Sequence, residues 1–140
     1  MKLSYESIQA FLYGEARAQA EKRWADWLAH YADDVDFFMP CWDDADRQGL
    51  EDRVFRIETD RSSASTPDTR YNRAISNIEI LAQDEASVDL CFNWTTHSFR
   101  YDIVDVYFGT SRYTLDTSGP KPLIKKKYVV LKNDYIHHML

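Results

Sequence analysis

The sequence contains few of the residues that form disulfides, metal sites and flexible linkers. Its 140 residues include only 2 Cys, 4 Gly and 4 Pro. Cys41 and Cys91 lie far apart without C-x-x-C spacing, which indicates neither a zinc site nor a disulfide framework. No apolar run is long enough to span a membrane, and the N-terminus lacks the features of a signal peptide. We therefore expect one ordered domain, residues 1–140, in the cytoplasm.

The motifs of common enzyme classes are also missing. There is no G-x-S-x-G nucleophile motif, no glycine-rich phosphate loop and no paired Cys/His ligand motif. The stretch "DADRQGLEDRVF" begins like a calcium-binding loop, but Phe55 stands where that loop needs a bidentate glutamate. The nominal acid or base candidates are Asp36, His30, His97 and Tyr13, and no spacing singles them out. The sequence thus predicts no catalytic, cofactor-binding or metal-binding residue in this chain.

Positive charge is in deficit, because 17 Lys and Arg stand against 23 Asp and Glu, for a net charge of −6. This balance disfavours nucleic-acid binding despite the local run of lysines at 125–127. That run lies in "LIKKKYVVLKNDYIHHML", which we interpret as a final β-hairpin. Its lysines would protect an exposed sheet edge or face an acidic partner. His137 and His138 would point to opposite faces of a strand, so they would not bind one metal ion together.

The hydrophobic pattern predicts helices first and strands afterwards. Two amphipathic helices are indicated by apolar residues at helical spacing: Ile8, Phe11, Leu12 and Ala16, then Trp24, Trp27, Leu28 and Tyr31. The aromatic residues of the second set are better explained as core than as the lining of a ligand cavity. A short strand at "VDFFMP" and about four long strands follow, with regular alternation from Val88 to Thr96. This order predicts an α+β fold, with N-terminal helices packed on a curved, mainly antiparallel sheet.

Several long segments resemble a known family. The stretches "FLYGEARAQAEKRWADWLAHYADDVDFFMPCWDD", "GLEDRVFRIETDRSSAS", "YFGTSRYTLDTSG" and "KKKYVVLKNDYIHH" are similar to the small (β) subunit of bacterial aromatic-ring-hydroxylating dioxygenases, and most of all to the benzoate, toluate and anthranilate 1,2-dioxygenase group. The resemblance extends from residue 11 to residue 138. It implies a cystatin-like fold related to nuclear transport factors and ketosteroid isomerases. It also implies a structural role in an oxygenase that cis-dihydroxylates an aromatic carboxylate such as benzoate or anthranilate.

The same resemblance implies where the cofactors and partners are. A Rieske [2Fe-2S] cluster and a mononuclear iron are expected in the large α subunit, with electrons from a separate reductase that uses NADH. Three α and three β chains are expected to form a hexamer, so the partners are the α subunit and two further copies of this chain. The residues agree, because neither cysteine has a histidine two or three positions later and no two-His-one-carboxylate cluster stands out. Two other functions stay open: a cavity enzyme, such as an isomerase or dehydratase using Asp36 or His97, and a binding module for a small aromatic ligand.

The charged stretch "GLEDRVFRIETDR" is our candidate for part of a subunit interface. Its Arg53, Arg56 and Arg61 can form bidentate pairs with carboxylates of another chain, although pairing within the monomer is the alternative. The segment before it departs from the family pattern, because it is short between Trp42 and Gly49. We therefore expect a gap in the ordered chain near residues 46–48.

Overall fold

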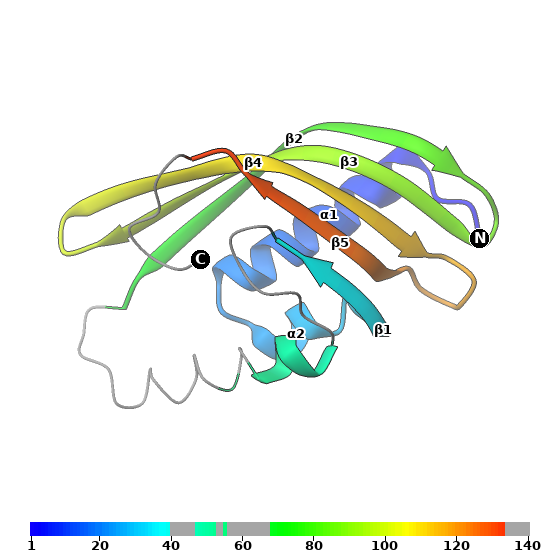
Figure 1. Cartoon of the computed structure of the whole chain (residues 1–140), viewed down its shortest axis with the longest axis horizontal. Coiled ribbons are helices and arrows are strands. Elements are labelled where there is room, and N and C mark those ends of the chain that lie inside the picture. Colours follow the sequence, from blue (N-terminus) through cyan, green and yellow to red (C-terminus); the bar gives the residue numbers. More distant parts are fainter. Residues whose placement is uncertain (40–46, 53–54, 56–67, 134–140) are drawn as a thin grey trace.

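The computed structural model describes residues 1–39, 47–52, 55 and 68–133. Two helices, α1 (Tyr5–Ala20) and α2 (Trp24–Leu28), precede the sheet in the chain. The five strands are β1 (Tyr31–Phe38), β2 (Arg70–Gln83), β3 (Ser87–Arg100), β4 (Ile103–Asp116) and β5 (Leu123–Leu131). Figure 1 shows that the sheet curves over α1, with both helices on its inner side. Among the described residues, no helix is long and apolar enough to cross a membrane.

The strand order in the sheet is β1-β5-β4-β3-β2. The pairs β2–β3, β3–β4 and β4–β5 are antiparallel, and β1 pairs with β5 in parallel. The expected α+β fold with a mainly antiparallel, curved sheet is therefore confirmed.

Local sequence explains the first helix and the central strand. The Ser4 hydroxyl accepts a hydrogen bond from the Ser7 backbone N–H at 3.1 Å and so caps the start of α1. Ile8, Leu12 and Ala16 are buried at helical spacing and face the sheet. The alternation along β3 places residues 88, 90, 92 and 94 in the core, as the sequence predicted.

The second helix is shorter than predicted. It ends at Leu28, and Tyr31 begins β1 instead of completing a helical stripe. The reason is a long-range contact, because the backbone N–H of Ile124 in β5 donates to the His30 carbonyl at 2.8 Å. Pairing with β5 thus draws the chain into the sheet directly after α2. The prediction that these aromatic residues belong to the core holds, since Trp27 and Tyr31 are buried and Trp24 packs against them.

The prediction that the lysine run protects a sheet edge is wrong. Strand β5 lies between β1 and β4, so its lysines do not protect a sheet edge. Lys125 and Lys126 are exposed, but Lys127 is buried among the core residues. The predicted second strand of the final hairpin, with His137 and His138, lies outside the described residues.

The segment expected to contain a gap is described only in part. Arg47 and Gln48 are consecutive residues of one helical segment, residues 47–52, so no gap separates them. Asp44 and Asp46, the first two acidic residues of the calcium-loop-like stretch, lie outside the described residues. Leu50 of this helical segment reaches the core.

Candidate functional site

A buried polar network centred on Glu15 lies between the sheet and the helices. One carboxylate oxygen, Oε2, accepts hydrogen bonds from Trp27 Nε1 at 2.9 Å, Tyr31 OH at 2.8 Å and Lys127 Nζ at 3.0 Å. The other oxygen, Oε1, accepts from Tyr113 OH at 2.6 Å. The donors come from α2, β1, β5 and β4, so this one carboxylate joins four elements to α1.

Lys127 forms the positive half of this network. Its Nζ donates to Tyr31 OH at 2.7 Å as well as to Glu15. It also lies between 5.3 and 5.8 Å from the ring centroids of four aromatic residues, Trp27, Tyr31, Phe37 and Tyr113. Such rings stabilise a cation through their negative faces. Lys127 is therefore held charged by one carboxylate and an aromatic cage.

The electrostatics of the network favour an ionised pair with neutral tyrosines. Burial raises the pKa of Glu15, but the Lys127 charge and hydrogen bonds from Tyr113, Lys127 and Tyr31 outweigh it and lower the pKa to about 2. Burial lowers the pKa of Lys127, and Glu15 opposes that shift. Burial and the Glu15 charge raise the pKa of Tyr31 and Tyr113 well above the usual value. Both tyrosines therefore act as hydrogen-bond donors.

This network has a structural role and is unsuited to acid–base chemistry. A general base needs an accessible lone pair and a pKa near the working pH. Both oxygens of Glu15 are already occupied by donors, and its pKa is far below neutrality. We conclude that Glu15 and Lys127 tie the helices to the sheet.

The nominal catalytic candidates do not meet in the structure. Asp36 and His97 are exposed on β1 and β3, and Tyr13 is 47% exposed on α1. His30 packs edge-on against Phe11, and its Nδ1 lies 2.8 Å from the Asp26 carbonyl. Within the described ranges, no group of three or more His, Cys, Asp or Glu side chains could hold a metal ion. Arg53, Arg56 and Arg61 lie outside the described residues.

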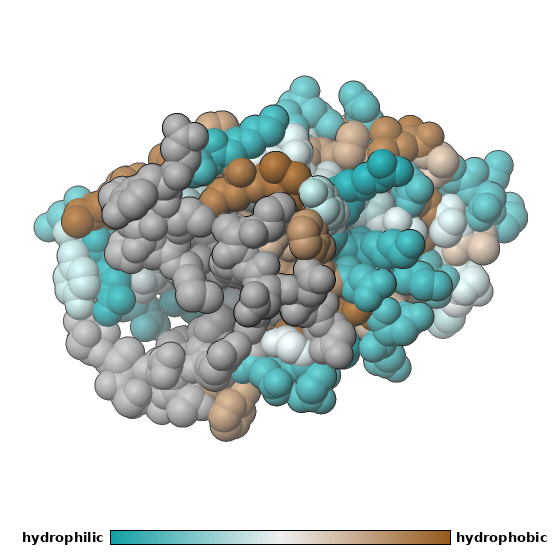
Figure 2. All heavy atoms as spheres, in the orientation of Figure 1, coloured by the Kyte–Doolittle hydropathy of each residue, from teal (hydrophilic) through white to brown (hydrophobic). Residues whose placement is uncertain are grey.

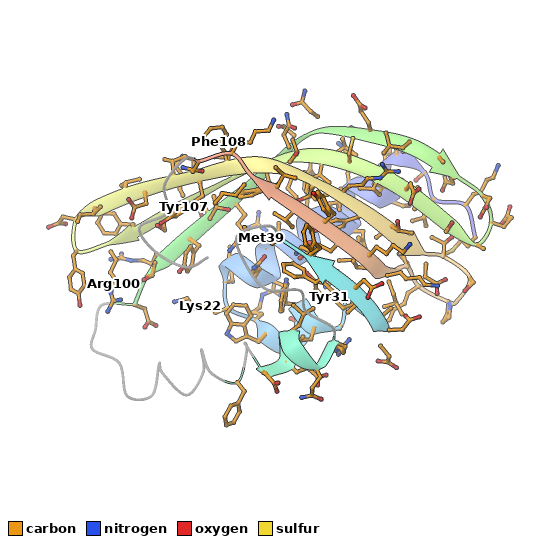
Figure 3. All side chains as sticks on the ribbon, viewed as in Figure 1. Lys22, Tyr31, Met39, Arg100, Tyr107 and Phe108 are labelled. Carbon is orange, nitrogen blue, oxygen red and sulfur yellow. The ribbon has the colours of Figure 1, made fainter. Side chains whose placement is uncertain are left out.

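The outer face of the sheet is unusually apolar. Exposed side chains there include Phe38, Val104, Val106, Phe108 and Tyr128, which we call the outer apolar surface. Phe38 and Tyr128 stack across β1 and β5, with ring centroids 5.0 Å apart. Figure 3 shows Phe108 and its neighbour Tyr107 on opposite sides of β4, and Figure 2 shows hydrophobic side chains gathered over β4 and β5. Exposed apolar side chains gathered on one face are typical of protein–protein contact sites.

A shallow hollow of about 470 Å³ adjoins this surface. Tyr128 and Val130 form its apolar side, and Arg112 and Glu79 contribute opposite charges. The hollow opens on the outer face, away from the Glu15 network. Its remaining lining residues come from β2, β3 and β4: Asn77, Cys91, Phe92, Asn93, Thr110 and Ser111.

The Glu15–Lys127 pair was not predicted from the sequence, although the sequence contains a signal for it. Glu15 follows Leu12 by three positions and therefore falls on the apolar stripe of α1. Lys127 precedes Val129 by two positions, on the buried face of β5. A charged residue on a buried face is expected to have a partner of opposite charge. The pattern does not say that Glu15 and Lys127 are each other's partner.

Comparison with known proteins identifies the family. The ring hydroxylating beta subunit family matches residues 44–138. This chain belongs to that family. It is 49% identical to the toluate 1,2-dioxygenase subunit beta of Pseudomonas putida, over 100% of this chain and 97% of the relative. The crystal structure of the benzoate 1,2-dioxygenase beta subunit from Burkholderia mallei has 49% identity and a TM-score of 0.92, covering 99% of this chain and 97% of that one.

A more distant structural relative confirms the predicted fold relationship. A ketosteroid isomerase-like protein from Erwinia carotovora superimposes with a TM-score of 0.72 at 12% identity, covering 95% of this chain and 99% of that one. At this identity the likeness concerns the fold alone. The family of oxygenase β subunits thus shares its architecture with proteins of quite different function.

Proposed function

We propose that this chain is the structural β subunit of the terminal oxygenase of a Rieske non-haem iron dioxygenase that cis-dihydroxylates an aromatic carboxylate such as benzoate. The observation that carries the proposal is the saturated Glu15–Lys127 network. Both oxygens of Glu15 accept hydrogen bonds and its pKa is about 2, so the network offers no general base for a small cavity enzyme. The match to toluate and benzoate 1,2-dioxygenase β subunits over the full chain supports the same role.

The cofactors then belong to the large α subunit. That subunit would hold the Rieske cluster and the mononuclear iron, and a separate reductase would supply electrons from NADH. Support comes from the described residues, which contain no group able to hold a metal ion. The complete assembly would contain three α and three β chains, with the β chains arranged as a trimer.

The outer apolar surface is the proposed contact with the large subunit. The relatives are β subunits, so a larger chain is the partner for which the comparisons provide support. The surface carries both charge signs, since Arg112 forms an ion pair with Asp89 at 3.6 Å. A side chain of the large subunit entering the 470 Å³ hollow would find apolar walls and both charge signs.

Arg53, Arg56 and Arg61 are proposed as a second part of the assembly interface. An arginine buried and paired across an interface leaves its partner charge stranded when it is removed. Replacing such an arginine by Ala therefore weakens assembly by about 2 to 5 kcal/mol. Size-exclusion chromatography with light scattering on each Ala variant, mixed with large subunit, measures this. Assembly of all three variants like the parent would reject the assignment.

Reconstitution tests the structural role itself. The isolated chain, given reductase and NADH, should retain no stoichiometric iron and oxidise no benzoate, whereas the large subunit with this chain should be active. Stoichiometric iron in the isolated chain after mild chelation would contradict the proposal. So would isomerase or dehydratase activity that disappears in Asp36→Asn or His97→Gln.

A further inference from the structure

Arg73 lies on the inner side of the sheet in a row of polar and aromatic residues. It stands opposite Thr96 of β3, and Thr96 stands opposite Tyr107 of β4. Residues directly opposite in antiparallel strands project to the same face. Thr96 and Tyr107 are buried and Arg73 is half-buried, so the row lies within the space between the sheet and the helices.

Only some N–H groups of the Arg73 guanidinium donate hydrogen bonds within this chain. Its Nη1 donates to Thr96 Oγ1 at 3.1 Å. Its Nε is buried and has no hydrogen-bond partner within the described part of the chain. No acidic side chain among the described residues forms an ion pair with it. Since Nη1 is occupied by Thr96, the unused edge is the fork formed by Nε–H and one N–H of Nη2, which suits the two oxygens of a carboxylate.

The charge balance of the interior also lacks one anion. Glu15 forms its ion pair with Lys127, and no described acidic side chain forms an ion pair with Arg73. Burial lowers the pKa of Arg73 and the Glu15 charge opposes that shift, while a guanidinium keeps its proton at neutral pH. Arg73 also adds to the effect of burial in lowering the pKa of Lys127. Two buried cations that share one carboxylate are a costly arrangement, which a second, bound anion would relieve.

The neighbourhood of Arg73 favours an anion that carries a flat apolar group. The Arg73 Cζ lies 5.8 Å from the centroid of the Tyr71 ring. Tyr107 ends the row, and Ile75 follows Arg73 on the same face of β2. Aromatic rings and an aliphatic side chain pack well against an aryl group, while the guanidinium binds its carboxylate.

We propose that Arg73, with Tyr71 and Tyr107 beside it, anchors a binding site for a small aromatic carboxylate on the inner side of the sheet. The carboxylate accepts two hydrogen bonds from the Nε and Nη2 of Arg73, and Thr96 holds the guanidinium in place through Nη1. The site belongs to this chain alone and does not depend on the proposed subunit role. It involves binding and no chemical step.

Binding is tested on the full chain with benzoate as the probe. Addition of benzoate should shift the Arg73 Nε–H resonance in an NMR spectrum that resolves arginine side-chain N–H groups. The shift should saturate as the benzoate concentration rises. Acetate lacks the ring and benzamide lacks the charge, so each should bind at least about tenfold more weakly, since losing one matched contact costs about 1.4 kcal/mol or more. Calorimetry on the same samples provides the dissociation constants. A parent chain that shows no saturable benzoate response overturns the proposal.

Two variants test whether benzoate binding needs the Nε and Nη2 groups of Arg73 or only a positive charge. Arg73→Lys keeps the positive charge and removes the bidentate edge, so benzoate affinity should fall about tenfold or more while the chain stays folded. Arg17→Gln, at an exposed position of α1, is the matched control and should bind like the parent. Equal benzoate affinity in Arg73→Lys and the parent would overturn the proposal. Phosphate or chloride competing as strongly as benzoate would also overturn it, because the site would then be a general anion site.

Discussion

At the scale of single residues, the notable feature is an ion pair buried in a small core. Glu15 is 2% exposed and Lys127 is 7% exposed. Such a pair adds little net stability compared with apolar residues of the same shape, because both ions lose their hydration. Removing one partner is far more damaging, because the other charge stays buried without compensation. The pair therefore specifies how α1 sits against β5 more than it adds stability.

Replacing Lys127 by Met should destabilise the chain strongly. It leaves Glu15 ionised and buried, so the free energy of unfolding should fall by about 3 to 5 kcal/mol. Urea denaturation of the variant measures the loss, and Lys126→Met, at the exposed neighbouring position, should stay close to the parent. The double variant Glu15→Gln with Lys127→Met should recover part of the loss, because no charge is left buried and the amide oxygen can still accept from Trp27 and Tyr31. Equal stability of the Lys127 and Lys126 variants would contradict this account.

The loss of folding stability at low pH should depend on Glu15. Its pKa is about 2 in the folded chain and 4.5 in the reference state, so its stabilising effect is complete above about pH 4.5 and disappears as the pH falls toward 2. The shift corresponds to a change on the order of 3 kcal/mol. The stability difference between the parent and Glu15→Gln should therefore shrink by about this amount across that range, as measured by urea denaturation at each pH. Glu6→Gln, exposed on the same helix, is the control, and a difference that stays constant with pH would contradict the assignment.

At the scale of elements, a close approach of two strands depends on Gly109 of β4. A Cβ at this position would overlap the backbone carbonyl of Val130 in β5, and it would lie 3.1 Å from Cζ2 of Trp94. The Trp94 ring thus covers the glycine across the β3–β4 pair. A backbone carbonyl cannot move aside as a flexible side chain can, so the strand pairing itself would have to shift.

Gly109→Ala should therefore lower the free energy of unfolding by about 1 to 3 kcal/mol through overpacking. Gly119→Ala is the matched control, because a Cβ there meets no atom within 4 Å. Thermal or urea unfolding of both variants measures the contrast. If the two alanine variants have the same stability, the close packing of β4 on β5 is not as described.

At the scale of the whole molecule, the two sides of the sheet have separate tasks. The inner side carries the core and the Glu15 network, and the outer side carries the outer apolar surface, which is our proposed contact with the large subunit. Phe108→Asp places a charge at the centre of that surface without touching the core. It should weaken association with the large subunit by about tenfold or more, or at least about 1.4 kcal/mol, and leave the unfolding transition nearly unchanged.

Tyr13→Asp on α1 is the control for this variant, because Tyr13 is 47% exposed and Phe108 is 46% exposed. Binding of each variant to the large subunit, measured by interferometry or analytical ultracentrifugation, decides the matter. Unchanged binding by Phe108→Asp would remove the outer apolar surface from the large-subunit contact. Loss of self-association with intact large-subunit binding would assign the surface to another copy of this chain.

Elements whose signal is local could be predicted from the amino-acid sequence. Helical spacing from Ile8 to Ala16 and strict alternation from Val88 to Trp94 depend only on the period of the backbone, so α1 and β3 were predictable. The lack of common metal-ligand motifs is also visible in the amino-acid sequence. The family was accessible too, because long continuous segments carry the resemblance.

Features that join residues distant in the sequence could not be predicted and depend on the folded arrangement of the strands. Glu15 and Lys127 are 112 positions apart, and no local pattern says that they meet. The parallel pairing of β1 with β5 placed Lys127 in the core and ended α2 early. The unused edge of Arg73 likewise became visible only when Thr96 was found opposite it. Strand order and charge pairing depend on which segments pack together, and periodicity along the chain does not contain that information.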